Sequence, residues 1–290
     1  MRSAESTRRP TLFGIIGYPL HTTWSPAIYN AAFNVSNLPF HYAPFAIAPA
    51  RLKRGVAALA DLGVRGFNVT VPHKEAILPF LASASELVRT LGAANTVVAR
   101  PRGWHGENTD VVGFTAPLYR YRRQLAGRSA VVLGAGGAAR AVLCALLREF
   151  DMSAVLVVAR NRSRAEGVAH WAQSLSPGSA VAGARLGDSS NWRAAFREAA
   201  LVVQATPVGS VGSRQDRVLP AGFKFNRGQI ACDLVYGRNT DFLIRAHRGG
   251  AVAQDGSGML LAQAAAAFEV FTGASYPWRA VGRGLLRRRS

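Results

Sequence analysis

Lys74 and Asp110 are the charged residues of this sequence best suited to move a proton. Lys74 follows the apolar segment 67–71 and falls in the first turn of a helix expected from Pro72. The positive end of a helix dipole disfavours a cation, so an amine there gives up its proton more readily. Asp110 is the candidate carboxylate that would orient this amine for general acid and base work. The alternatives are an exposed surface lysine and an aspartate that caps a helix beginning at Val111.

Thr23, Ser25 and Asn95 offer hydrogen-bonding groups for a polar ligand. Thr23 and Ser25 are two residues apart. Pro26 biases Ser25 toward an extended backbone, in which residues at this spacing point the same way. The two hydroxyls could therefore hold a carboxylate or a polyol, and the Asn95 amide, at the start of an expected strand, could bind a substrate hydroxyl. The competing interpretations are a helix cap for Ser25 and an ordinary turn residue for Asn95.

A glycine-rich run joins an apolar strand to a helix in the middle of the chain. The strand covers 129–133, and an alanine- and leucine-rich helical segment follows the run. A helix N-terminus presents unpaired N–H groups and a positive dipole end, and glycines let a pyrophosphate approach the backbone. The pattern predicts a dinucleotide site formed by Gly134, Ala135, Gly136, Gly137 and Ala138.

Basic residues end the next strand, at the position where NAD-binding proteins carry an acid. The strand over 154–159 is followed by Arg160, Asn161, Arg162, Ser163 and Arg164. An aspartate or glutamate there would bond the ribose 2′-hydroxyl of NAD, whereas an arginine accommodates the 2′-phosphate of NADP. The segment predicts NADP (NADPH) as the cofactor, with a solvated basic loop as the alternative.

Two successive α/β series must position these residues. The first has expected strands at 12–17, 41–47 and 66–71 and helices at 27–34, 49–62 and from 72 onward. The second has expected strands at 129–133, 154–159, 201–205, 229–234 and 251–254, followed by a helix over 258–272. Such alternation predicts parallel sheets covered by helices. The expected α/β architecture is a substrate-binding catalytic domain over 1–111, a Rossmann-type domain over 112–254 and a C-terminal helical segment over 255–290.

Composition narrows the class of protein. The 290 residues are 49% hydrophobic, yet no apolar run approaches the length of a membrane span, and the first ten residues lack the apolar centre of a secretory signal. We therefore expect a soluble cytoplasmic protein with no membrane partner. Cys144 and Cys232 lack the spacing of a metal site or a disulfide framework, so no metal is expected.

The formal net charge of +19 comes almost wholly from arginine, because Lys53, Lys74 and Lys224 are the only lysines. The arginines are scattered along the chain, as a compositional bias would place them, and no nucleic-acid partner is expected. A positive surface attracts an anionic substrate and cofactor instead. The expected assembly is a monomer or a homodimer.

Several ordered segments resemble motifs of the shikimate dehydrogenase family. They are the segment around Ser25, NVTVPHK, GAANT, GENTD, GAGGAAR, NRS, ATPVG, DLVYG and DGSGMLLAQAAAAFEVFTG. The resemblance runs from Phe13 to Gly273 and implies an NADP-dependent, reversible reduction of 3-dehydroshikimate to shikimate, a step of aromatic amino acid and chorismate biosynthesis. It also implies that the segment 255–290 returns to the substrate domain.

The same resemblance implies a role for each matching residue. Lys74 would exchange a proton at the substrate oxygen while hydride moves to or from the nicotinamide, and Asp110 would orient Lys74 and bond a substrate hydroxyl. The implied substrate contacts are Thr23, Ser25, Thr70, Asn95, Tyr236 and Gln263. The implied cofactor contacts are Gly134 through Ala138, Asn161, Arg162, Thr206, Leu234, Gly256 and Met259. Met259 and Gln263, four residues apart, share one helix face, which suits contacts to the nicotinamide and the substrate respectively.

Two positions depart from the family pattern. Thr23 replaces the first serine of His-Ser-x-Ser-Pro, and Gln204 stands where asparagine precedes Ala-Thr-Pro. A methyl group added in a tight pocket changes selectivity by about 1–3 kcal/mol. Three hypotheses follow: a shikimate dehydrogenase, a dehydrogenase of quinate or another analogue within the same family, and a non-enzymatic basic binding protein.

Overall fold

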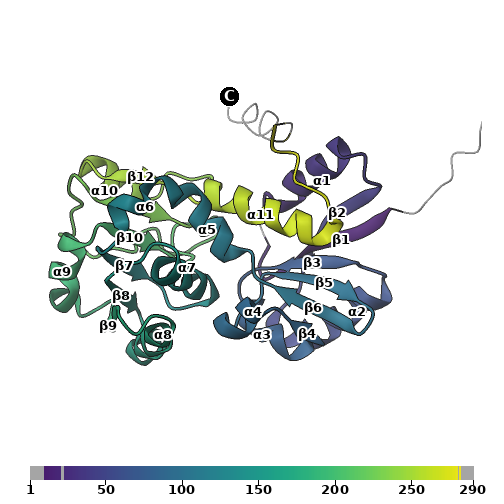
Figure 1. The fold of residues 1–290 in the computed structure, drawn as a ribbon, viewed down its shortest axis with the longest axis horizontal. Helices are drawn as coiled ribbons and strands as arrows, with labels where there is room; N and C mark the ends of the chain where they lie inside the picture. The colour runs from purple at the N-terminus through teal and green to yellow at the C-terminus, as the bar shows by residue number, and fades with distance from the viewer. Residues whose placement is uncertain (1–9, 21–22, 280, 282–290) are drawn as a thin grey trace, which may run out of the picture. The chain divides into compact units, whose positions relative to one another are not determined.

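The computed structural model describes residues 10–20, 23–279 and 281, and the chain divides into two compact units. The first comprises Met1–Thr109 and Ala264–Ser290, and the second comprises Asp110–Gln263 (Figure 1). The boundaries drawn from the sequence pattern lie at 111 and 254 instead. Helix α11 (Ser257–Thr272) begins in the second unit and ends in the first.

The first unit is built on a mixed sheet of six strands. They are β1 (Thr11–Gly17), β2 (Phe40–Ala46), β3 (Gly66–Val69), β4 (Ser83–Ala84), β5 (Thr96–Arg100) and β6 (Gly103–Glu107), in the order β2-β1-β3-β5-β6-β4. Strand β1 pairs in parallel with β2 and β3, whereas β5 is antiparallel to both β3 and β6. The three strands expected from the sequence, β1, β2 and β3, are parallel as predicted, and the antiparallel pairs involve β5, whose direction the sequence pattern does not give. Only two residues join β5 to β6, with Gly103 at φ +117°, and a connection this short allows only an antiparallel pair.

The helices of the first unit are α1 (Ser25–Val35), α2 (Leu52–Asp61), α3 (His73–Ala76) and α4 (Glu86–Leu91), with 3₁₀ turns at Pro49–Arg51 and Leu78–Phe80. The helix expected from Pro72 is thus a single turn. Pro79 lacks an N–H and disfavours the helical conformation of the residue before it, so the helix ends there. An argument from a helix dipole at Lys74 consequently loses its basis, because one turn aligns few peptide dipoles.

Aromatic side chains from α11 complete the core of the first unit. The rings of Phe271 and Phe13 lie 5.0 Å apart, and those of Phe268 and Phe33 lie 5.6 Å apart. Gly66 on β3 makes room for this packing, because a Cβ there would lie 2.9 Å from the Phe271 ring. Burying such a side chain is worth about 1.5–3 kcal/mol, so the end of α11 is held firmly on this sheet.

The second unit has a wholly parallel sheet. Its strands are β7 (Ser129–Leu133), β8 (Ala154–Ala159), β9 (Ala180–Arg185), β10 (Leu201–Gln204), β11 (Ile230–Asp233) and β12 (Val252–Gln254), in the order β12-β11-β10-β7-β8-β9. The chain runs outward from β7 to β9 and then returns to place β10 on the other side of β7. Ligands of such sheets bind at this reversal, beyond the carboxyl ends of the strands.

Helices cover both faces of this sheet, which confirms the predicted α/β fold class. They are α5 (Asp110–Leu118), α6 (Arg122–Leu125), α7 (Gly137–Arg148), α8 (Arg162–Leu175), α9 (Ser189–Glu198) and α10 (Asp241–Arg248), with a 3₁₀ turn at Tyr119–Tyr121 (Figure 1). Val132 faces a cluster that includes α7 and α8, and its neighbour Val131 faces a cluster that includes α9 and α10. Both faces of β7 are therefore buried, as its unbroken apolar sequence predicts.

Candidate functional site

Most of the polar residues predicted in the first unit lie at one end of its strands. Thr23 follows β1, Thr70 follows β3 and Thr109 follows β6, at the carboxyl ends of parallel strands. Asn95 precedes β5, and because β5 is antiparallel its first residue lies at that same end. Were β5 parallel to β3, Asn95 would lie at the opposite ends of the strands. The antiparallel strand therefore brings Asn95 to the other candidate residues.

A buried hydrogen-bond network organises this end of the sheet. The Tyr42 hydroxyl donates to Asn68 Oδ1 at 2.7 Å, and Asn68 Nδ2 donates to Thr96 Oγ1 at 3.0 Å. The Asn95 side chain accepts from the Thr109 N–H at 2.8 Å and donates to Thr109 Oγ1 at 2.9 Å. Leaving any of these groups unpaired would cost about 1–3 kcal/mol. The network therefore fixes the backbone immediately before Asp110.

Tyr42 and Asn68 are functional-site neighbours that sequence reasoning missed. Asn68 is 5% exposed in the middle of β3, between Phe67 and Val69. A polar residue in so apolar a strand needs buried partners, so this placement was the available signal.

Lys74 and Asp110 lie on segments that are tied to consecutive residues of one loop. The Lys74 carbonyl accepts from the Ala94 N–H at 2.9 Å, and Asn95 holds Thr109 as described above. Lys74 is half-buried on α3, and Asp110 is buried as the first residue of α5. The loop before β5 thus holds the main chain at Lys74 and at Thr109.

His73, beside Lys74, is a further residue that the sequence analysis did not single out. Its ring is buried, and Nε2 lies 2.6 Å from the Ile47 carbonyl. A carbonyl only accepts, so Nε2 carries the proton in this contact. The bond fastens α3 to the segment after β2 and so steadies the main chain at Lys74.

Thr23 and Ser25, the two hydroxyl residues after β1, do not form the helix cap considered for Ser25. Ser25 is the first residue of α1 and is 4% exposed, and no side chain caps this helix. The Ser25 N–H instead donates to Thr23 Oγ1 at 3.2 Å. The interpretation of Ser25 as a helix cap is therefore wrong, and Thr23 supplies the local hydrogen bond.

The glycine run lies at the strand-order reversal of the second unit. Gly134 has φ +125°, and a Cβ there would lie 2.9 Å from the Ala205 carbonyl oxygen, so β7 and β10 approach too closely for a side chain. Helix α7 begins at Gly137, with Gly136 as an N-cap that makes no side-chain bond. A Cβ at Gly136 would meet nothing within 4 Å. The open backbone of this turn suits the pyrophosphate of a dinucleotide.

Three other predicted cofactor contacts lie on neighbouring loops at this reversal. Gln204 Oε1 accepts from the Thr206 hydroxyl at 2.8 Å, and Gln204 Nε2 donates to the Val208 carbonyl at 2.9 Å. The Leu234 N–H donates to the Gln204 carbonyl at 2.9 Å, and a Cβ at Gly256 would collide with the Leu234 carbonyl. Gln204, which departs from the family pattern, therefore shapes the loop that carries Thr206.

Helix α11 carries Met259 and Gln263 beside α5. Met259 is 9% exposed in the core of the second unit, and Gln263 Nε2 donates to the Leu260 carbonyl at 2.9 Å. A Cβ at Gly113 of α5 would lie 2.7 Å from Gln263 Cβ, so this glycine permits the close packing of the two helices. Tyr236, the remaining predicted contact, is half-buried after β11.

The basic segment after β8 is organised by hydrogen bonds rather than left as a free loop. Asn161 caps α8, its Oδ1 accepting from the Arg164 N–H at 2.9 Å. Arg162 Nε lies 2.8 Å from Glu166 Oε1. Arg164 Nε donates to the Ala135 carbonyl at 2.9 Å, so it contacts the glycine run directly. Sequence reasoning did not assign Arg164 to the site, because no spacing rule reports a contact across two strands.

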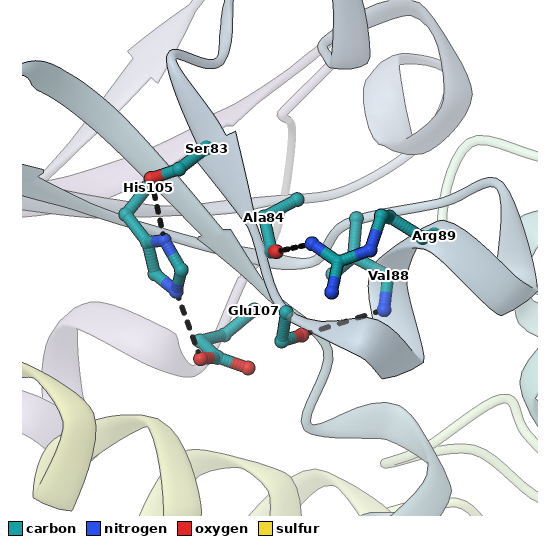
Figure 2. A network of polar contacts seen from close by, with 7 residues as sticks. Ser83, Ala84, Val88, Arg89, His105 and Glu107 are labelled. Carbon is teal, nitrogen blue, oxygen red and sulfur yellow. Dashed lines mark hydrogen bonds and ion pairs between the residues drawn. The ribbon is translucent and has the colours of Figure 1, made fainter.

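A polar network links the edge strand β4 of the first unit to its neighbour β6. His105 Nδ1 lies 2.8 Å from Ser83 Oγ, and its Nε2 lies 3.0 Å from Glu107 Oε1 (Figure 2). Arg89 donates to the Ala84 carbonyl nearby. These contacts join β4, α4 and β6, and β6 leads directly into Thr109 and Asp110.

Asp233 is a buried carboxylate at the end of β11. Burial raises its pKa to about 6, against the opposing effects of hydrogen bonds from Thr240 and Val235, and Asp255 raises the pKa further. The folded protein therefore binds this proton more tightly than the unfolded chain between about pH 4 and pH 6. The free energy of unfolding should fall across that window as pH rises, by about 3 kcal/mol from this group.

Replacing Asp233 with asparagine should remove this contribution, because the amide does not titrate. Urea denaturation of the wild type and of Asp233→Asn at pH 4 and pH 7 measures it. The wild type should lose more stability than the variant between the two values, and equal losses would contradict the raised pKa.

Residues 10–20, 23–279 and 281 contain no helix of the length and apolarity that a bilayer crossing requires. The same part of the chain holds no group of three or more histidine, cysteine or acidic side chains placed to bind a metal ion.

Known proteins resemble this chain over nearly its full length. A family model described as the shikimate dehydrogenase substrate binding domain matches residues 15–97. A shikimate dehydrogenase (NADP(+)) of Trichormus variabilis is 38% identical over 275 residues, 91% of this chain and 92% of that protein. A crystal structure of a shikimate dehydrogenase in complex with NADP+ has a TM-score of 0.84 at 28% identity and covers 97% of this chain and 96% of that one. The quinate dehydrogenase of Corynebacterium glutamicum, solved in complex with NAD, has a TM-score of 0.82 at 29% identity, with coverage of 96% and 99%. The chain belongs to the shikimate dehydrogenase family.

Proposed function

We propose that this chain is an oxidoreductase that reduces 3-dehydroshikimate to shikimate reversibly with NADPH. Two hydrogen bonds carry the proposal. The N–H of Ala94 bonds the Lys74 carbonyl, and the side chain of the next residue, Asn95, accepts from the Thr109 N–H. An acid/base catalyst must be held within hydrogen-bond reach of its partner and of the reacting oxygen. A binding protein without catalysis would have no need of such ties at Lys74 and at the residue before Asp110. The relatives named shikimate dehydrogenase (NADP(+)) support the same reaction.

In the proposed mechanism Lys74 moves the proton. The Lys74 ammonium donates a proton to the ketone oxygen during reduction, and the neutral amine takes it back from the hydroxyl during oxidation. The bound cofactor supplies or accepts the hydride at the same carbon. Asp110 orients the amine and accepts a hydrogen bond from a substrate hydroxyl. Atoms and charge balance, because one proton and one hydride add across the carbonyl bond.

Hydroxyl and amide side chains would hold the rest of the substrate. Thr23 and Ser25 would bind the carboxylate, and the ring hydroxyls would contact Thr70, Asn95, Tyr236 and Gln263. The glycine run would hold the pyrophosphate, and the remaining cofactor contacts would be Asn161, Arg162, Thr206, Leu234, Gly256 and Met259. The buried Asn95 also supports the loop before Asp110, so its loss would disturb the acid/base pair as well as the substrate.

Quinate is the second candidate substrate, and Thr23 is the observation that favours it. The threonine methyl stands beside the predicted carboxylate site, where quinate and shikimate differ at the ring carbon that bears the carboxylate. The similar solved structure named quinate dehydrogenase shows that the fold accommodates this chemistry.

Steady-state kinetics decide between the candidates. The value of kcat/KM should be highest for shikimate with NADP+, lower for quinate with NADP+ and lower again for either acid with NAD+. A higher value for quinate would make the chain a quinate dehydrogenase. No turnover with either acid would overturn the enzymatic proposal.

The proposed partner is the small-molecule substrate alone, without nucleic acid. We place the enzyme in the cytoplasm as a monomer or a homodimer. The excess of positive charge would draw the anionic acid and the phosphorylated cofactor to the protein.

A further inference from the structure

An acidic residue holds the arginine that the sequence assigns to the 2′-phosphate. Arg162 opens α8 and Glu166 follows one turn later, so both side chains lie on one helix face. The Arg162 Nε to Glu166 Oε1 distance is 2.8 Å, and the two side chains are 64% and 49% exposed. Asp188, at the start of α9, adds a second negative charge near this guanidinium.

Arg164 has a different environment from Arg162. Its Nε is bonded to the Ala135 carbonyl, so a protein acceptor anchors this guanidinium at the glycine run. Arg162 is instead held through a carboxylate, which competes directly with a phosphate for the same donors. The segment after β8 therefore carries a counter-charge within the basic group that is expected to read NADP.

We propose that Glu166 weakens the preference of this enzyme for NADP over NAD by competing with the 2′-phosphate for Arg162. The inference rests on the proposed cofactor site after β8. A 2′-phosphate must replace or share the Glu166 contact, and the two anions repel each other while it does so. A cofactor with a free 2′-hydroxyl carries no such charge, so Glu166 affects its binding little.

Binding of adenosine fragments tests this inference without turnover. Isothermal titration calorimetry of the full chain with adenosine 2′,5′-bisphosphate and with adenosine 5′-monophosphate separates the 2′-phosphate from the rest of the ligand. Glu166→Gln should tighten the bisphosphate about three- to fivefold, the range that an exposed ion pair supplies. The affinity for the monophosphate should stay unchanged. The gain should shrink at high salt, because screening weakens exposed charges.

A double-mutant cycle and a matched control sharpen the result. Arg162→Ala should weaken the bisphosphate more in the Glu166→Gln background than in the wild type, because the arginine is then released for the phosphate. Glu149→Gln makes the same change in net charge beyond the far end of α7 and should leave both affinities unchanged. An unchanged or weaker bisphosphate affinity in Glu166→Gln would overturn the inference.

The outcome is separable from that of the proposed reaction. If the wild type turns over shikimate but Glu166→Gln leaves bisphosphate binding unchanged, only the inference about Glu166 fails. If the bisphosphate tightens but no cyclohexane carboxylate is turned over, the inference stands and the proposed substrate is wrong.

Discussion

Lys74→Ala should lower kcat for shikimate oxidation by about a hundred- to ten-thousandfold, the contribution of a well-placed general acid or base. Alanine cannot take the proton from the substrate hydroxyl, so the oxygen would carry the developing charge unaided. The Ala94 N–H bonds the Lys74 carbonyl, and the Ile77 N–H bonds the carbonyl of the preceding residue, His73. Neither bond requires the Lys74 side chain. Stopped-flow or steady-state absorbance of NADPH measures the loss directly.

The control for this variant is another lysine. Lys53 is exposed on α2, a different helix, and Lys53→Ala makes the same change of charge. It should retain normal turnover. Binding of adenosine 2′,5′-bisphosphate should be equal in both variants, because this fragment contacts only the cofactor site. Turnover of Lys74→Ala within a few fold of the wild type would remove Lys74 from the mechanism.

The second unit was largely predictable from its sequence because its strands are buried on both faces. The segments 130–133 and 201–203 are short apolar runs, which favour a central parallel strand. Strand β9 was missed for the opposite reason. It lies at the sheet edge, and its mostly small residues are all exposed or partly exposed, so its apolar pattern is weak.

The first unit shows what local patterns leave out. The sequence indicates a strand near Thr96, but its direction depends on the two-residue connection before Gly103 and on pairing with β3. Helix α3 was overextended because the reading of Pro72 as a helix start ignored Pro79. Both features concern the position of the site: the strand direction decides where Asn95 lies, and the helix length decides how Lys74 is supported.

The candidate site was predictable in residue type but not in its supporting contacts. Family motifs single out Asn95, Asp110 and Arg162 directly. The contacts that Asn68, Thr109 and Glu166 make become apparent only when strands and helix turns are placed in space. Arg162 and Glu166 face each other across one helix turn, and a motif that names the arginine does not report the glutamate.

Gly134→Ala should both destabilise the fold and weaken the cofactor. At φ +125° an L-residue is strained by about 1–3 kcal/mol, and the new Cβ would lie 2.9 Å from the Ala205 carbonyl oxygen. The turn must then shift away from β10. If the N–H groups of the turn bond the pyrophosphate as proposed, those charge-assisted hydrogen bonds weaken and the affinity for NADP+ should fall about ten- to a hundredfold.

Two other glycines separate the causes of this loss. Gly167, within α8, has open space around a built Cβ, so Gly167→Ala should raise stability by about 1 kcal/mol and leave cofactor affinity unchanged. Gly136 has φ −103° and equally open surroundings, so Gly136→Ala should fold normally yet weaken NADP+, because its methyl group occupies the approach to the turn. Thermal unfolding and cofactor titration of the three variants measure both quantities. If Gly136→Ala bound NADP+ as tightly as the wild type, the pyrophosphate would not lie on this turn, and the loss in Gly134→Ala would reflect the strained backbone alone.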